Sequence, residues 1–191
     1  MNILIKDILA LLPEGAKSCS VYITNGVIAS TSSAPEGFKA EKEINGAGKM
    51  LIPGLVNAHT HASMTIFRKC ADDLLFNDWL FGKIMPLEEK LTAEDCYWGM
   101  LLAIMEMLRT GTTAFIDMYS FMDALVGAIE ESGIRAILSR GLLGGSDDPK
   151  AGEERLREAI DAAEKWKGRD NFCFMLAPHA PYTCEIGRAH V

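Results

Sequence analysis

Strand and helix patterns alternate along the chain from residue 51 onward, and this alternation restricts the possible folds more than any other feature. Apolar, β-branched runs predict strands, and apolar residues at helical spacing predict the helices between them. We expect strands at about 51–58, 112–118, 134–138 and 171–177, and helices at about 92–110, 121–132 and 153–166. Units of this kind favour an α/β fold with a parallel sheet or barrel.

The interval between these units matches the first half of a (β/α)₈ TIM-like barrel. A complete barrel needs about 250 residues, whereas residues 51–184 offer roughly half of that. A half-barrel leaves an unpaired strand edge and uncovered apolar helix faces. We therefore expect residues 53–184 to be part of a larger barrel. The final segment EIGRAHV, residues 185–191, matches one reading frame of a common sequencing adapter, and we expect it to be non-native.

The first long helix has a clear start and an apolar pattern. Thr92 and Asp95 have the spacing of a capping box. Helical periodicity places four large side chains in the expected core: Trp98, Met100, Met105 and Met107.

Residues 1–52 follow a different pattern, in which short strands are joined by turns. Asn25-Gly26 lies between β-branched residues and is a strong hairpin signal. We expect this segment to be part of a small β-sandwich domain preceding the barrel.

Charge and cysteine content argue against several functional classes. The net charge is −7 and the isoelectric point is about 5.1, without a basic stripe, which argues against nucleic-acid binding. Five cysteines without a Cys-x-x-Cys pair suit a reducing compartment, so we expect a cytoplasmic protein. No run reaches the roughly 18 apolar residues of a membrane span.

The segment LIPGLVNAHTHASM, residues 51–64, contains the main chemical signal. His59 and His61 are two residues apart at the end of a strand-like run, so both imidazoles can point to one face and bind one metal ion. Imidazole nitrogens suit zinc, and also iron or nickel. For the pair alone, two solvated surface histidines are an alternative of about equal weight to a divalent metal site.

Five sequence blocks resemble the amidohydrolase superfamily, in particular the purine-deaminating branch that includes 5′-methylthioadenosine/S-adenosylhomocysteine deaminases. The blocks cover residues 57–74, 79–99, 106–119, 133–143 and 178–183. The resemblance extends over nearly all of residues 1–184. It implies metal-dependent hydrolytic deamination of an adenosine-type nucleoside to an inosine-type product and ammonia, with zinc as the expected metal and iron or nickel as alternatives.

The resemblance also implies roles for individual residues. His59 and His61 would bind the metal, Glu88 the ribose hydroxyls, Arg140 a substrate carboxylate, and His179 the purine. From the residues alone, Glu88 reads as a solvated acid, Arg140 as part of a surface salt bridge and His179 as structural. A second carboxylate contact from Arg155 stays open, and Asp117 reads as supporting or structural.

Such enzymes complete the site with a further histidine, an aspartate and general acid/base carboxylates from later strands, so no catalytic residue is assigned within this chain. The expected partner is a small nucleoside, and enzymes of this type often self-associate.

Two other functions stay open. One is a different amidohydrolase, such as a guanine or cytosine deaminase or a triazine chlorohydrolase. The other is an inactive fragment, because half a ligand set holds a catalytic metal poorly. Glu88 and Arg140 discriminate among these enzymes. A substrate with a ribose and a carboxylate offers a contact to each residue, whereas a bare ring offers neither contact.

Overall fold

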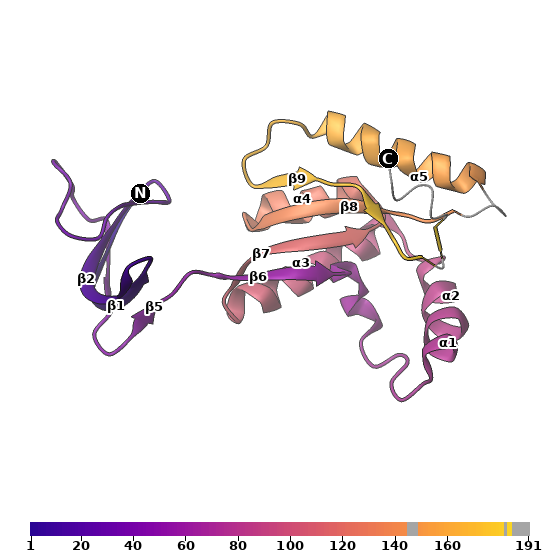
Figure 1. Ribbon diagram of the computed structural model, residues 1–191, viewed down its shortest axis with the longest axis horizontal. Coiled ribbons are helices and arrows are strands. Elements are labelled where there is room, and N and C mark those ends of the chain that lie inside the picture. The colour runs from indigo at the N-terminus through magenta and orange to yellow at the C-terminus, as the bar shows by residue number, and fades with distance from the viewer. Residues whose placement is uncertain (145–148, 182, 185–191) are drawn as a thin grey trace. The chain divides into compact units, whose positions relative to one another are not determined.

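The computed structural model describes residues 1–144, 149–181 and 183–184 (Figure 1). The predicted non-native tail, residues 185–191, lies outside these residues. The chain divides into two compact units, Met1–Pro53 and Gly54–Val191.

The first unit is a five-stranded sheet around a small apolar core. Its strands are β1 (Asn2–Leu12), β2 (Gly15–Thr24), β3 (Val27–Ser30), β4 (Lys42–Asn45) and β5 (Met50–Leu51). The order is β3-β2-β1-β4, with β5 also pairing with β1. The predicted hairpin is confirmed: Asn25 and Gly26 both have positive φ and join β2 to β3. Ile8, Ala10 and Val21 form the core.

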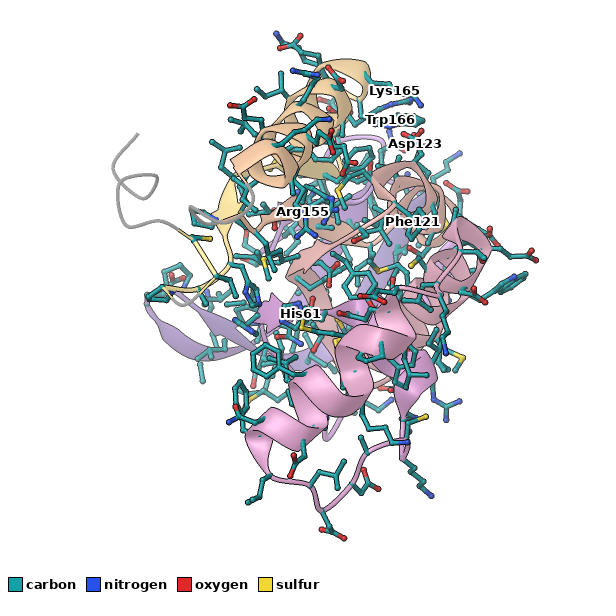
Figure 2. All side chains as sticks on the ribbon, turned by 90° about the vertical axis from the view of Figure 1, so that its right-hand side faces the viewer. His61, Phe121, Asp123, Arg155, Lys165 and Trp166 are labelled. Atoms are coloured by element: carbon teal, nitrogen blue, oxygen red, sulfur yellow. The ribbon has the colours of Figure 1, made fainter. Side chains whose placement is uncertain are left out.

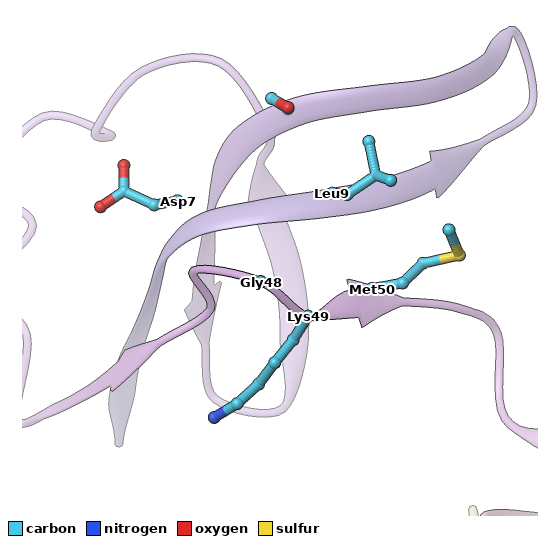
Figure 3. Close-up of a pocket in the computed structure, with 6 residues that line it drawn as sticks. Asp7, Leu9, Gly48, Lys49 and Met50 are labelled. Atoms are coloured by element: carbon cyan, nitrogen blue, oxygen red, sulfur yellow. The ribbon is translucent and has the colours of Figure 1, made fainter.

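A β-bulge interrupts the pairing of β1 and β2 between Ile5 and Ile8, where Asp7 has a φ of 53°. Figure 3 shows Asp7 beside a shallow surface pocket that Leu9, Lys49 and Met50 also line.

The second unit contains a parallel, curled sheet, as the strand and helix alternation predicts. Its strands are β6 (Leu55–Thr60), β7 (Thr112–Tyr119), β8 (Arg135–Leu142), β9 (Phe172–Phe174) and β10 (Ala177–Pro178). Their order is β10-β8-β7-β6, and β9 also pairs with β8. Within the described residues, β6 pairs only with β7, and its Leu55 and Val56 are exposed.

Three long helices cover this sheet: α3 (Ala93–Arg109), α4 (Met122–Ser132) and α5 (Pro149–Lys165). The predicted capping box at Thr92 and Asp95 is present at the start of α3. Gly133, at a φ of 71°, ends α4 in the left-handed conformation that favours glycine. α3 and α4 pack on each other and on β7 and β8, which encloses the core around Met100, Phe115 and Leu125 (Figure 1).

The prediction of a buried side chain is wrong for two of the four residues assigned to this core. Met100 and Met107 are buried, but Trp98 and Met105 are 58% and 50% exposed. Helical periodicity identifies an apolar helix, but α3 is covered on one side only among the described residues.

The long connection between β6 and α3 is largely helical. It contains the 3₁₀ helix η1 (Ala62–Phe67) and a continuous helical run made of α1 (Phe76–Trp79), the π-helical turn η2 (Leu80–Ile84) and α2 (Met85–Glu88). Pro86 has no amide hydrogen, and in an α-helix its ring would clash with the Gly82 carbonyl. The wider π-helical turn directly before Met85 and Pro86 is a local change of helix type that accommodates such a clash.

Polar contacts hold η1 and the following loop against α3. The Ser63 and Thr65 hydroxyls donate to the carbonyls of Cys96 and Gly99, and Arg68 makes a two-point ion pair with Glu106. The connection is therefore attached to the same helix that packs behind β7. None of the helices described is long and apolar enough to cross a membrane.

Candidate metal-binding and substrate site

The two histidines of the predicted metal site lie side by side at the end of β6. Their ring centroids are 5.2 Å apart and the ring planes meet at 81°. The pairing of β6 with β7 advances from Asn57–Phe115 to Thr60–Asp117, so β6 contains an extra residue between Asn57 and Thr60, in the stretch that includes His59. Such a bulge redirects the side chains that follow it.

Strand alternation places these rings away from the helices. Thr60 is in register with Asp117, and Asp117 has the same orientation along β7 as Phe115, which packs in the helix-covered core. His59 and His61 flank Thr60 and therefore project to the opposite face, the inner face of the curled sheet. Figure 2 looks onto the ends of the strands and shows His61 near the middle of this end of the unit.

The hydrogen bond of His61 determines which ring nitrogen can bind a ligand. Nδ1 of His61 lies 2.8 Å from the backbone carbonyl oxygen of Met118. Because a carbonyl oxygen only accepts, Nδ1 carries the proton, and in the neutral ring Nε2 presents its lone pair. A backbone carbonyl that fixes the tautomer in this way is common behind metal-binding histidines.

These residues fit part of a zinc site. Two adjacent imidazoles, one with its tautomer fixed, are a suitable donor pair for zinc. Residues 1–144, 149–181 and 183–184 contain no group of three or more histidine, cysteine or acidic side chains that could hold a metal. The described part of the chain thus offers two nitrogen donors of the three or four protein ligands of a zinc site.

His179 lies within electrostatic reach of His61 and of Glu88. Glu88 is the last residue of α2, and His179 follows β10. Burial lowers the pKa of His179 most, the neighbouring His61 and Arg155 lower it further, and the Glu88 carboxylate opposes them. Nδ1 of His179 is 2.8 Å from the Thr183 hydroxyl. The structure therefore brings His61, Glu88 and His179 to one end of the sheet.

Arg140 is held by an ion pair. Its Nε donates to Glu158 of α5 at 2.6 Å, and its side chain is only 14% exposed. The sequence analysis gave two interpretations of Arg140, a salt bridge and a contact to a substrate carboxylate. The structure contains the salt bridge. Arg155 of α5, labelled in Figure 2, is within electrostatic reach of His179, as His61 is.

Two polar residues of β7 are buried behind the histidine pair: Asp117, which the sequence analysis reads as supporting or structural, and Tyr119, to which it gives no role. Asp117 is fully buried, and burial raises its pKa above the ordinary value. Its Oδ1 accepts from the Thr60 hydroxyl and the Ala62 amide at 2.6 Å, while Oδ2 has no partner within the described residues. Tyr119 is also buried, and burial followed by the Glu88 charge raises the pKa of its hydroxyl.

Comparisons with known proteins agree with this architecture. The family model described as "Amidohydrolase family" matches residues 50–186. A 5-methylthioadenosine/S-adenosylhomocysteine deaminase of Carboxydothermus hydrogenoformans is 55% identical over 145 residues, which are 75% of this chain and 33% of that protein. The deaminase of the same name from Dictyoglomus turgidum is 45% identical over 188 residues, which are 96% of this chain and 43% of that protein.

Solved structures give the same result. An adenosine deaminase from Xanthomonas campestris with bound zinc has a TM-score of 0.84 and 31% identity, over 95% of this chain and 43% of that one. A guanine deaminase from C. acetobutylicum with bound guanine has a TM-score of 0.78 at 19% identity, over 97% and 48% of the two chains, and supports the fold alone. The chain spans a third to just under half of the length of these relatives. Its matched residues and its parallel half-barrel show that it belongs to the amidohydrolase family.

Proposed function

We propose that the intact protein is a metal-dependent deaminase of adenosine-type nucleosides such as 5′-methylthioadenosine and S-adenosylhomocysteine. The observation that carries this proposal is the histidine pair of β6, with the His61 tautomer held by the next strand. Deaminases of this name are 55% and 45% identical to the chain across the segments that contain the pair.

His59 and His61 would hold zinc through one ring nitrogen each, with iron or nickel as other metals that imidazole accepts. When bound, such an ion lowers the pKa of a water molecule toward neutrality and so supplies a nucleophile for the amino-bearing carbon of the purine. The chain's own contribution is to place the two rings side by side and to keep Nδ1 of His61 protonated. The remaining ligands and the general acid/base belong, in this proposal, to a part of the barrel beyond residue 184.

The other predicted residues bind the substrate in this proposal. Glu88, the last residue of α2, accepts hydrogen bonds from the ribose hydroxyls. His179, which burial and nearby positive charge keep neutral, hydrogen-bonds the purine. Arg140 uses Nε to hold Glu158, and the other edge of its guanidinium contacts the carboxylate of S-adenosylhomocysteine.

The domain organisation completes the proposal. Residues 1–52 belong to a β-sandwich domain, residues 53–184 form the first half of the barrel, and residues 185–191 are non-native. The protein acts in the cytoplasm without nucleic-acid or membrane partners.

Sequencing the source DNA across codon 184 and assaying the extended gene product tests this function. We expect a reading frame that supplies a histidine-bearing strand and a later aspartate, and a product that releases ammonia from both thioether nucleosides. A gene product that carries zinc and acts on guanine but not on either thioether nucleoside would refute the proposed substrate class. A stop codon directly after codon 191 would refute the enzyme proposal.

A further inference from the structure

Three consecutive residues of β7 hold the turn that carries the histidine pair. The Thr60 hydroxyl lies 2.9 Å from the Ile116 carbonyl oxygen and 2.6 Å from Oδ1 of Asp117, and shares its proton between them. The Ala62 amide donates to the same Oδ1 at 2.6 Å. His61, between these residues, bonds to the carbonyl of Met118.

Asp117 therefore accepts a hydrogen bond from the residue on each side of His61. It does so from the helix-covered face of the sheet, whereas the imidazoles project from the inner face. Asp117 is fully buried and separated from that inner face by the strand itself. Asp117 can therefore affect a ligand on that face through its hydrogen bonds on either side of His61 and through its electrostatic interaction with His61.

A purely structural origin explains this carboxyl group poorly. Burying a carboxyl group costs free energy, and Oδ2 has no hydrogen-bond partner within the described residues. An apolar side chain at this position would avoid that cost. An apolar side chain could not, however, accept from Thr60 and Ala62 together.

We propose that Asp117 is a positioning residue for the metal-binding pair. Its carboxyl group fixes Thr60 and Ala62, so that the His61 ring keeps its Nδ1 proton on the Met118 carbonyl and presents Nε2 to the inner face. The functional meaning of this role rests on the proposed metal site. The effect of Asp117 on the His61 ring, however, can be tested in the absence of metal.

Long-range ¹H–¹⁵N NMR of the imidazole rings in the metal-free 191-residue chain is the test. The chain has four histidines, and an H61N variant assigns the His61 signals. In the wild-type chain we expect one protonated nitrogen, Nδ1, and one unprotonated nitrogen, Nε2. In D117A both signals should move toward the average of two exchanging tautomers, while D117N, which retains an acceptor oxygen, should stay close to wild type.

Matched variants separate positioning from general packing. Ser139 is also buried, and its hydroxyl donates to the backbone carbonyl of Asp117 at 2.8 Å without touching the turn. S139A should therefore leave the His61 signals unchanged. T60V removes only the hydroxyl contact and should shift the signals partway, and T60S should restore them. If circular dichroism shows that D117A is unfolded, T60V and T60S test the positioning role in its place.

The proposal is overturned if folded D117A or T60V retains the wild-type His61 tautomer, or if S139A produces the same change as D117A. Zinc added to the completed protein and followed by the same NMR experiment separates the proposed function from this inference. If Asp117 controls the tautomer but zinc perturbs neither histidine of the pair in the completed protein, the positioning role stands and the proposed metal site is wrong.

Discussion

Nδ1 of His61 lies 2.8 Å from the carbonyl oxygen of Met118, so the backbone of β7 fixes the ring that follows β6. His61 lies just beyond the end of β6, where a free ring could rotate about two side-chain torsions. Anchoring the ring to a neighbouring strand removes that freedom before any ligand arrives. The site thus depends on the packing of β6 and β7, which gives the stability of this region functional importance.

Gly99 of α3 lies at a close contact behind this site. A Cβ at position 99 would be 2.4 Å from the Ser63 carbonyl oxygen, so G99A must push η1 away from α3. We expect G99A to reduce the free energy of unfolding by about 1–3 kcal/mol in urea denaturation. Gly127 of α4 is the control, because a Cβ there meets Tyr97 only at 3.7 Å. G127A should be neutral or stabilising by up to about 1 kcal/mol, and equal losses for both variants would contradict the contact.

Asp123 at the start of α4 binds the end of α5. Oδ2 accepts from Lys165 at 2.6 Å and Oδ1 from the Trp166 indole at 2.7 Å, and Figure 2 shows the three side chains together. The Lys165 bond, followed by the Trp166 bond, lowers the pKa of Asp123 below its ordinary value of 3.8. A lowered folded-state pKa stabilises the fold above pH 3.8, and this stabilisation disappears as the pH falls through the folded-state pKa.

The corresponding variant is D123N. Because Asp123 and Lys165 are more than half exposed, we expect a loss of at most about 1 kcal/mol at pH 7 that vanishes in strong acid. Urea denaturation at several pH values measures it. A difference between D123N and wild type that is independent of pH would show that the charge of Asp123 contributes nothing.

Arg140 should discriminate between the two thioether substrates in the completed enzyme. S-adenosylhomocysteine has a carboxylate and methylthioadenosine does not, so R140M should lower kcat/KM for the former by about 10–100-fold more than for the latter. E158Q is the control, because it removes the ion-pair partner at 2.6 Å and retains the guanidinium. Equal losses on the two substrates would contradict the proposed contact.

The cysteines should differ in reactivity. Burial raises the pKa of Cys96 to about 11, whereas Cys70 and Cys173 are exposed. Alkylation at pH 8 followed by mass spectrometry should label Cys70 and Cys173 first and label Cys96 only in denaturant. Rapid labelling of Cys96 in the native protein would show that α3 separates from η1 in solution.

The sequence predicts local features whose signals are short-range. The capping box at Thr92, the Asn25-Gly26 hairpin and the alternation of strands and helices depend on neighbouring residues, and all three are present. Element boundaries are less accurate: the predicted strand at 171–177 is two short strands, β9 and β10.

Features that depend on contacts between distant segments were not predictable. The Asp117 contacts join residues 55 positions or more apart, and Arg140 meets Glu158 only because α5 folds back over β8. The apolar pattern of α3 likewise does not reveal which of its faces is covered, so Trp98 was wrongly placed in the core.

A chimeric enzyme tests the central claim most directly. Residues 1–184 of this chain would be joined to the remaining C-terminal part of the Carboxydothermus hydrogenoformans deaminase, which is 55% identical over 145 residues. We expect the chimera to retain about one zinc ion per chain, as one metal site requires, and to deaminate both thioether nucleosides. The H59A/H61A chimera should lose both properties. A zinc-loaded, folded chimera without deaminase activity, or full zinc content and activity in H59A/H61A, would contradict the account.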